Sequence, residues 1–223
     1  MGKVGQVMMK NIYMIRHGES EGNARMVEED SYIIDSNIRL NKKGIEQAKE
    51  AGRILNKHLN VYDGVFWVSP FTRTRETFQN ICETVNDDIK KYDYIEDPRL
   101  VEQDFGDFDF QFYSKWKDIS PHSFFINQAR YNDESGRFFA RLENGENMLD
   151  VYNRVSLFVK TRLETNSYHN NIIVTHGYAS IALTMFLLNL RVEEFYYTET
   201  PKNGSVRHIL YKDGKYIDKG FID

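Results

Sequence analysis

Residues 11–20 read NIYMIRHGES, a short and mostly apolar run that passes directly into a cluster of polar residues. The run Asn11–Ile15 does not alternate cleanly between apolar and polar positions, which is typical of a strand buried on both faces of a parallel sheet. Two later segments have the same form. They are Val65–Val68 (VFWV), which passes into Ser69-Pro70 and then Arg73, and Asn171–Thr175 (NIIVT), which passes into His176-Gly177.

Helical patterns alternate with these three predicted strands. Asn41 is a residue type that caps helices, and apolar residues recur at intervals of three and four over 148–159. The other segments that we expect to be regular are helices at 41–59, 71–85 and 178–190 and a strand at 205–211 that turns at Asp213-Gly214. This alternation predicts an α/β fold, a three-layer α/β/α sandwich with a mostly parallel central sheet, in one domain spanning residues 1–223.

The overall composition fits a globular protein and limits its partners. Of 223 residues, 41% are hydrophobic, and the net charge of −4 argues against nucleic-acid binding and against a general anionic-membrane surface. The single cysteine, Cys82, allows no intrachain disulfide and predicts a packed thiol in a reducing compartment. Residues 1–10 lack the apolar core of a signal peptide, and the most apolar stretch, 181–188, is too short to span a bilayer. We therefore expect a cytoplasmic protein.

The three predicted strands deliver similar side chains to one place. In open α/β sheets, ligands bind outside the carboxyl ends of the strands. The residues that would gather there are two His, two Arg and two Ser: His17, His176, Arg16, Arg73, Ser20 and Ser69. Planar arginine forks match phosphate oxygens, a neutral imidazole can attack phosphorus, and a second, doubly protonated histidine would stabilise the transferring oxygens.

At this point the segments resemble a known family. In order along the chain they are similar to the motifs of the histidine phosphatases, the phosphoglycerate-mutase-like superfamily. The similar segments are Arg16–Ser20 with Asn23, Ser69–Arg73, Leu100–Gly106, Asn144–Glu146 with Asp150, Arg154 and Val155, and Val174–Gly177. Each motif alone is weak evidence for the family, whereas five motifs in the family's order are strong evidence.

The resemblance implies a mechanism and a role for each matching residue. His17 would be the nucleophile that carries a phosphohistidine, and Glu102 would be the general acid and base. The phosphate pocket would consist of Arg16, Arg73 and His176, with Ser20, Asn23 and the Gly177 backbone as supports. No metal and no cofactor is implied, and the substrate would be a phosphorylated small molecule, with a phosphoprotein as an open alternative.

Within the family, Arg99–Gly106 and Ser135–Phe139 look most like mutase-like phosphatases of plants and lower eukaryotes. True mutases carry a Tyr-Gly-Ala-Leu-Gln-Gly-Leu-Asn-Lys run where this chain has Phe112-Tyr113 after Gln111. This departure predicts a hydrolase in preference to a mutase. Asn147 stands where many members have Ser, which we expect to change only a helix cap.

Several features keep two interpretations. Arg75 fits a surface salt bridge with Glu76 or Glu83 better than a place in the pocket. Glu102, Asp104, Asp107 and Asp109 form an acidic cluster, whose spacing favours a solvated loop with one functional carboxylate over a metal site. An excursion at about 105–144 is expected to cover the site. Within it lie Arg130, Arg137 and Arg141. Two interpretations fit these arginines equally well: ordinary surface charge, or a lid that recognises a second anionic group of the substrate.

Two other functions are carried as alternatives to hydrolysis. One is a phosphoglycerate mutase, in which the phosphoryl group returns to a bound sugar acid. The other is a phosphate-binding regulatory protein with weak turnover, against which the complete catalytic set argues. The sequence leaves open the natural substrate and the oligomeric state.

Overall fold

One six-stranded sheet forms the centre of the computed structural model, which describes residues 9–26, 34–59, 63–106 and 136–223. The strand order is β3-β2-β4-β1-β5-β6. The strands are β1 (Lys10–Arg16), β2 (Gly64–Val68), β3 (Asp93–Glu96), β4 (Asn170–Thr175), β5 (Val206–Lys212) and β6 (Lys215–Ile222). The first four in this spatial order are parallel, and β5 and β6 add an antiparallel edge.

The three apolar runs of the sequence form buried strands, and the strand predicted at 205–211 is present as the partly buried β5. All residues of β2 and β4 are buried, and so are most of β1. The sequence did not reveal β3 or β6, because both are edge strands that leave many residues partly or fully exposed. An edge strand carries polar residues and so lacks an apolar run.

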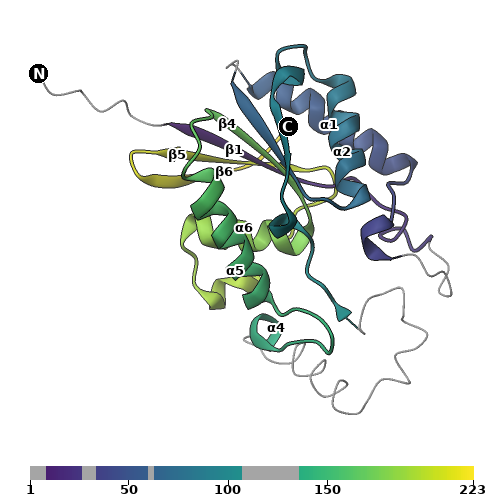
Figure 1. Cartoon of the computed structure of the whole chain (residues 1–223), viewed down its shortest axis with the longest axis vertical. Coiled ribbons are helices and arrows are strands. Elements are labelled where there is room, and N and C mark those ends of the chain that lie inside the picture. Colours follow the sequence, from purple (N-terminus) through teal and green to yellow (C-terminus); the bar gives the residue numbers. More distant parts are fainter. Residues whose placement is uncertain (1–8, 27–33, 60–62, 107–135) are drawn as a thin grey trace, which may run out of the picture.

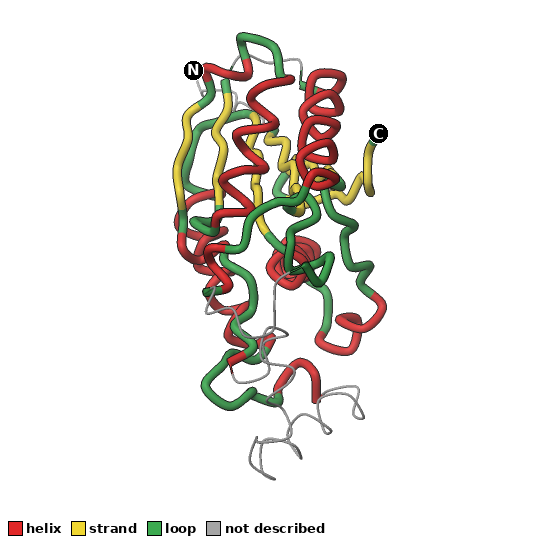
Figure 2. The backbone as a smooth tube through the Cα atoms, turned by 90° about the vertical axis from the view of Figure 1, so that its right-hand side faces the viewer, coloured by secondary structure: helices red, strands yellow, loops and turns green. Residues whose placement is uncertain are grey.

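Helices cover both faces of the sheet, as Figure 1 shows. The helices are α1 (Lys42–His58), α2 (Thr72–Thr84), α4 (Gly136–Phe139), α5 (Met148–Phe158) and α6 (Gly177–Leu188), and α5 continues into a π-helical turn, Val159–Leu163. One apolar core lies between the sheet and α1 and α2, and the other lies between the sheet and α5 and α6. Figure 2 shows long helices that run alongside the strands. The predicted α/β fold with a central sheet is confirmed.

The predicted helix starts are also confirmed. The Asn41 side chain accepts a hydrogen bond from the Gly44 N–H at 2.9 Å and so caps α1. Asn147 caps α5 and forms a capping box with Asp150, so the exchange of Ser for Asn preserves the cap. Short 3₁₀ helices lie at Asp35–Asn37, Ile89–Lys91, Pro98–Leu100 and Val192–Tyr197.

The predicted excursion lies mostly at 107–135, outside the described residues, so its role as a cover stays a prediction. No helix in the described ranges is both long and apolar enough to cross a membrane. Cys82 on α2 is half-buried rather than packed in the core as predicted, and burial raises the pKa of its thiol to about 11, which fits a thiol of low reactivity.

Candidate active site

The carboxyl ends of β1, β2 and β4 bring the predicted residues together. The sheet register pairs Arg16 with Thr175, and beyond the strands the His17 N–H donates to the Thr175 carbonyl at 2.9 Å. The ring centroids of His17 and His176 lie 5.1 Å apart. The gathering of side chains expected at this edge of the sheet is therefore present.

The His17 ring is buried and held in one tautomer. Its Nδ1 lies 2.7 Å from the Gly18 carbonyl oxygen. A carbonyl oxygen only accepts hydrogen bonds, so Nδ1 carries the hydrogen and Nε2 keeps its lone pair. Burial, together with the charges of Arg73 and Arg16, holds the pKa of His17 well below its usual value. His17 is therefore a neutral imidazole at pH 7, as a nucleophile must be.

His176 lies at the start of α6 and is fully buried. Its Nε2 hydrogen-bonds with the Ser69 hydroxyl at 2.8 Å, while its buried Nδ1 has no hydrogen-bond partner among the described residues. Burial first, and then the charge of Arg73, hold the pKa of His176 well below its usual value. Double protonation of His176 is therefore disfavoured in the ligand-free protein, and its protonation during phosphoryl transfer stays a prediction. A bound phosphate dianion would favour its protonation.

The two predicted arginines differ in how the protein holds them. Arg16 donates through Nη1 to the Pro201 carbonyl at 2.8 Å, and its buried Nε has no partner in the described part of the chain. Arg73 donates through Nη1 and Nη2 to the two carboxylate oxygens of Asp35, each at 3.1 Å. No sequence pattern points to Asp35, because it lies far from Arg73 along the chain and follows no predicted strand.

The loop after β1 is fixed by close backbone packing. A Cβ on Gly18 would lie 2.2 Å from the Gly44 carbonyl oxygen, so this position admits only glycine. The Gly18 N–H donates to the Thr77 hydroxyl at 3.1 Å. α1 and α2 therefore hold the loop in place from one side.

Ser20 and Asn23 shape the same loop from within. The Ser20 N–H donates to Asn23 Oδ1 at 3.3 Å, and the Asn23 N–H donates to the Ser20 hydroxyl at 3.1 Å. Asn203, which sequence reasoning missed, donates through Nδ2 to the His17 carbonyl and to Asn23 Oδ1, each at 3.1 Å. These residues hold His17 in place through the backbone of the loop.

Glu102 joins the cluster from the segment after Leu100. Its carboxylate accepts hydrogen bonds from the backbone N–H groups of Tyr178, at 3.0 and 3.2 Å, and of Ala179, at 3.2 Å. These N–H groups begin α6, and a helix N-terminus stabilises a negative charge. A Cβ on Gly177 would lie 3.4 Å from Glu102 Oε2 and 3.6 Å from Arg16 Cζ. Gly177 therefore leaves open the space between the carboxylate and this arginine.

Three arginines that the sequence left ambiguous have protein partners. Arg75 pairs with Glu96 at 2.6 Å, so the expected bridge to Glu76 or Glu83 is wrong. Arg141 pairs with Asp150 at 2.6 Å, and Arg137 donates to the Tyr178 hydroxyl at 2.7 Å. Arg130 lies outside the described residues. Whether Arg137 and Arg141 also contact substrate stays a prediction.

The described part of the acidic cluster shows a contact within a loop. Asp104 accepts a hydrogen bond from the Gly106 N–H at 2.8 Å, as in a tight turn. Asp107 and Asp109 lie outside the described residues. Within the ranges that the structure describes, no group of three His, Cys, Asp or Glu side chains could hold a metal ion.

The chain is similar to known proteins in sequence and in fold. The family description "Histidine phosphatase superfamily (branch 1)" matches residues 12–220. The Arabidopsis thaliana phosphoglycerate mutase-like protein AT74 is 32% identical over 93% of this chain, which spans 66% of that protein. The broad-range acid phosphatase DET1 of Saccharomyces cerevisiae is 26% identical over 87% of this chain and 83% of its own length.

A solved structure shows the same fold. A putative α-ribazole-5′-P phosphatase from Escherichia coli superimposes with a TM-score of 0.76 over 96% of each chain. Its sequence identity of 22% supports the fold alone.

Proposed function

This chain belongs to the histidine phosphatase superfamily, and from that membership and the geometry of its site we propose that it hydrolyses phosphate monoesters through a phosphohistidine on His17. The observation that carries the proposal is the state of the His17 ring. Its Nδ1–H is fixed on the Gly18 carbonyl at 2.7 Å, which leaves the Nε2 lone pair for phosphorus. Relatives named as a phosphatase and as a mutase-like protein are consistent with phosphoryl transfer.

In the first step, Nε2 of His17 attacks phosphorus while the bond to the leaving oxygen breaks. Arg16, Arg73 and His176 would neutralise the three transferring oxygens. Glu102, once protonated, would deliver its proton to the leaving oxygen, which would otherwise depart as a strongly basic alkoxide. The first product is then an alcohol, and His17 carries the phosphoryl group.

In the second step, water replaces the alcohol. The Glu102 carboxylate takes a proton from this water as its oxygen attacks phosphorus, and the bond from phosphorus to Nε2 breaks. The products are inorganic phosphate, neutral His17 and protonated Glu102, ready for another substrate. The proposed steps need no metal ion, because two guanidinium groups and His176 would surround the phosphoryl group.

A rapid-quench experiment tests the nucleophile. Wild-type protein should form an acid-labile, base-stable phosphoenzyme, and His17→Ala should lose it together with nearly all turnover while folding normally. His208→Ala is the matched control, because His208 is a half-buried histidine on β5 that bonds Asn11 away from the site. Substantial turnover in His17→Ala would remove His17 as the nucleophile.

The mutase alternative differs in the acceptor of the phosphoryl group. The mutase run is absent from the sequence after Gly106, so water should be the preferred acceptor. Incubation with 3-phosphoglycerate should yield free phosphate or no reaction. Rapid conversion to 2-phosphoglycerate, stimulated by the bisphosphorylated cofactor, would show a mutase instead.

For the natural substrate we propose a chemical class. We propose a phosphorylated small molecule in the cytoplasm, a location supported by the single cysteine. A panel of phosphorylated metabolites and phosphopeptides, scored by phosphate release, distinguishes this class from a phosphoprotein substrate.

A further inference from the structure

We propose that Arg154 is a positioning residue for Glu102, and that its ion pair with Glu146 fixes the backbone of the segment that carries the general acid. This inference rests on the proposed role of Glu102 in the phosphatase reaction. It assigns a function to two charged side chains that do not themselves take part in the chemistry.

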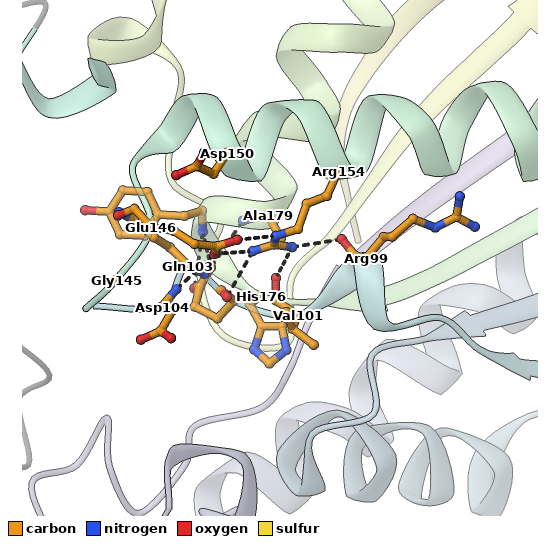
Figure 3. Close-up of polar contacts among 12 residues, drawn as sticks. Arg99, Val101, Gln103, Asp104, Gly145, Glu146, Asp150, Arg154, His176 and Ala179 are labelled. Atoms are coloured by element: carbon orange, nitrogen blue, oxygen red, sulfur yellow. Dashed lines mark hydrogen bonds and ion pairs between the residues drawn. The ribbon is translucent and has the colours of Figure 1, made fainter. Parts of the chain in front are cut away.

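The backbone around Glu102 depends on a side chain for its hydrogen bonds. Residues 101–105 follow the 3₁₀ turn Pro98–Leu100 and belong to no helix or strand. Their carbonyl groups therefore lack the partners that regular structure supplies. Arg154 on α5 donates to the carbonyl oxygens of Arg99 at 2.8 Å, Val101 at 2.7 Å and Glu102 at 3.0 Å (Figure 3).

Every N–H of the Arg154 guanidinium is used. Three go to these carbonyls, and the other two go to the Glu146 carboxylate, from Nε to Oε1 and from Nη2 to Oε2, each at 2.9 Å. Five donors are all that an arginine has. The Arg154 side chain is 16% exposed, so the protein rather than solvent fixes its place. A lysine has three donors and cannot form this pattern.

Glu146 binds the same segment directly on the other side of Glu102. Its Oε2 accepts the Asp104 N–H at 3.1 Å, and its carbonyl accepts the Gln103 side-chain amide at 2.7 Å. The Glu146 N–H donates to the Asp104 carbonyl at 2.8 Å. The chain is thus tied down both before and after Glu102.

The carboxylate of Glu102 is held separately, by the first N–H groups of α6. Two helices therefore determine where the acid lies, since α5 fixes its backbone through Arg154 and α6 fixes its carboxylate. A displacement of about 1 Å in a catalytic group can cost about 100-fold in rate. Arg154 is placed to prevent such a displacement.

The charge of Arg154 offers a second interpretation, because that charge also contributes to the lowered pKa of His176. An electrostatic role would act on the phosphoryl pocket and hence on every substrate alike. A positioning role acts through Glu102 and hence only on leaving groups that need a proton. Arg154→Lys separates the two, because it keeps the charge and loses the pattern of five hydrogen bonds.

The test measures single-turnover phosphorylation of His17 by glycerol 2-phosphate and by p-nitrophenyl phosphate. The nitrophenolate leaving group is weakly basic and needs little protonation. Arg154→Lys and Arg154→Met should slow the reaction with glycerol phosphate about 10-fold to 100-fold, and that with p-nitrophenyl phosphate less than about threefold. Glu102→Gln should show the same selectivity, and adding Arg154→Lys to it should cause little further loss.

Arg99→Met is the matched control. Arg99 lies in the 3₁₀ turn just before this segment, but its side chain points away from Arg154 in Figure 3 and pairs with Asp97 at 2.5 Å. This variant should slow both substrates by the same small factor. The rate with p-nitrophenyl phosphate also reports whether each variant is folded with an intact pocket.

Two results would overturn the inference and keep the proposed function. In the first, the Arg154 variants slow the reactions with both substrates by the same factor. In the second, Arg154→Lys keeps the wild-type ratio between the rates with the two substrates. If Glu102→Gln itself slows both substrates equally, Glu102 is not the acid and the inference fails together with that role. A phosphoenzyme that still forms in His17→Ala would contradict the proposed function, whatever the Arg154 variants show.

Discussion

The Asp35 carboxylate and the Arg73 guanidinium form a two-pronged ion pair at the edge of the phosphate pocket, with both N–O distances at 3.1 Å. The Asp35 carbonyl accepts a third hydrogen bond from Arg73 Nη1 at 2.7 Å. These contacts use both hydrogens of Nη1 and one of Nη2. The Nε hydrogen and the other Nη2 hydrogen remain, and they form the side fork of the guanidinium. A bound phosphoryl group would therefore share Arg73 with a fixed negative charge.

We predict that Asp35→Asn binds phosphate more tightly. Asparagine keeps an oxygen that accepts from Arg73, but it removes a charge that repels the phosphoryl group. A unit charge a few ångströms away is worth about 1 kcal/mol in water and more inside a protein. Because the Asp35 side chain is 30% exposed to solvent, we use the smaller of these two interaction energies. The inhibition constant for inorganic phosphate should fall about threefold to tenfold, and the effect should shrink in high salt.

The control for this prediction is Asp218→Asn. Asp218 on β6 pairs with Arg207, and its side chain is equally exposed at 30%, but it lies outside the site. This variant should leave phosphate inhibition unchanged. Weaker phosphate binding in Asp35→Asn would show that Asp35 serves to orient Arg73 and that orientation outweighs repulsion.

We also predict that Gly177→Ala folds but loses activity. The added methyl group would make contacts no shorter than 3.4 Å, and alanine favours the first turn of α6 more than glycine does. The same methyl group would fill the space between Glu102 and Arg16. We expect kcat/KM to fall at least about tenfold, with no loss in the free energy of unfolding.

Gly18→Ala provides the contrast, because its methyl group would collide with the Gly44 backbone at 2.2 Å. That variant should lose stability as well as activity, measured by urea unfolding. Wild-type kcat/KM in Gly177→Ala would mean that substrate does not enter the space beside Glu102.

The central residues of this site can be predicted from the sequence because a single structural rule determines where they lie. Side chains that directly follow buried parallel strands meet at the carboxyl edge of the sheet, and the buried strands are visible as apolar runs. His17, Ser69 and His176 are found in this way. Glu102 follows no buried strand, so the family resemblance was needed to single it out.

Other residues of the site carry no such signal. Asp35, Asn203 and the five hydrogen bonds of Arg154 depend on contacts between distant segments, and an isolated Asp, Asn or Arg has the same appearance on any surface. The charge state of His176 also had to come from the structure, since burial beside Arg73 determines it. The edge strands β3 and β6 could not be predicted for a related reason, because solvent-exposed strands lack the apolar pattern.

A third prediction concerns metal ions. Two arginines, together with a histidine that a bound phosphate dianion would protonate, can supply the positive charge that a divalent ion supplies in many phosphatases. Phosphate release from p-nitrophenyl phosphate should therefore be unchanged in excess EDTA. A loss of activity that magnesium or manganese restores would point to a cation site involving the acidic residues after Glu102.

The last prediction is that acid weakens the fold through its two active-site histidines. His17 and His176 have pKa values well below the usual one in the folded protein, because both are buried beside Arg73. In the unfolded chain they titrate near pH 6.5. Below that pH the unfolded chain binds more protons, so the free energy of unfolding falls as the pH is lowered. Each histidine should contribute about 1.4 kcal/mol per pH unit once the unfolded chain is protonated.

Urea unfolding between pH 7.5 and about 5 measures this slope before most carboxylates titrate. The double variant His17→Gln, His176→Gln should show a flatter profile, because it removes the two buried histidines whose pKa values are lowered. The half-buried His208, whose pKa burial also lowers, accounts for part of the slope that remains. Saturating phosphate should flatten the wild-type profile too, because a bound dianion favours the protonated form of His176. Equal slopes in the wild type and the double variant would mean that the two histidines are not neutral in the folded protein.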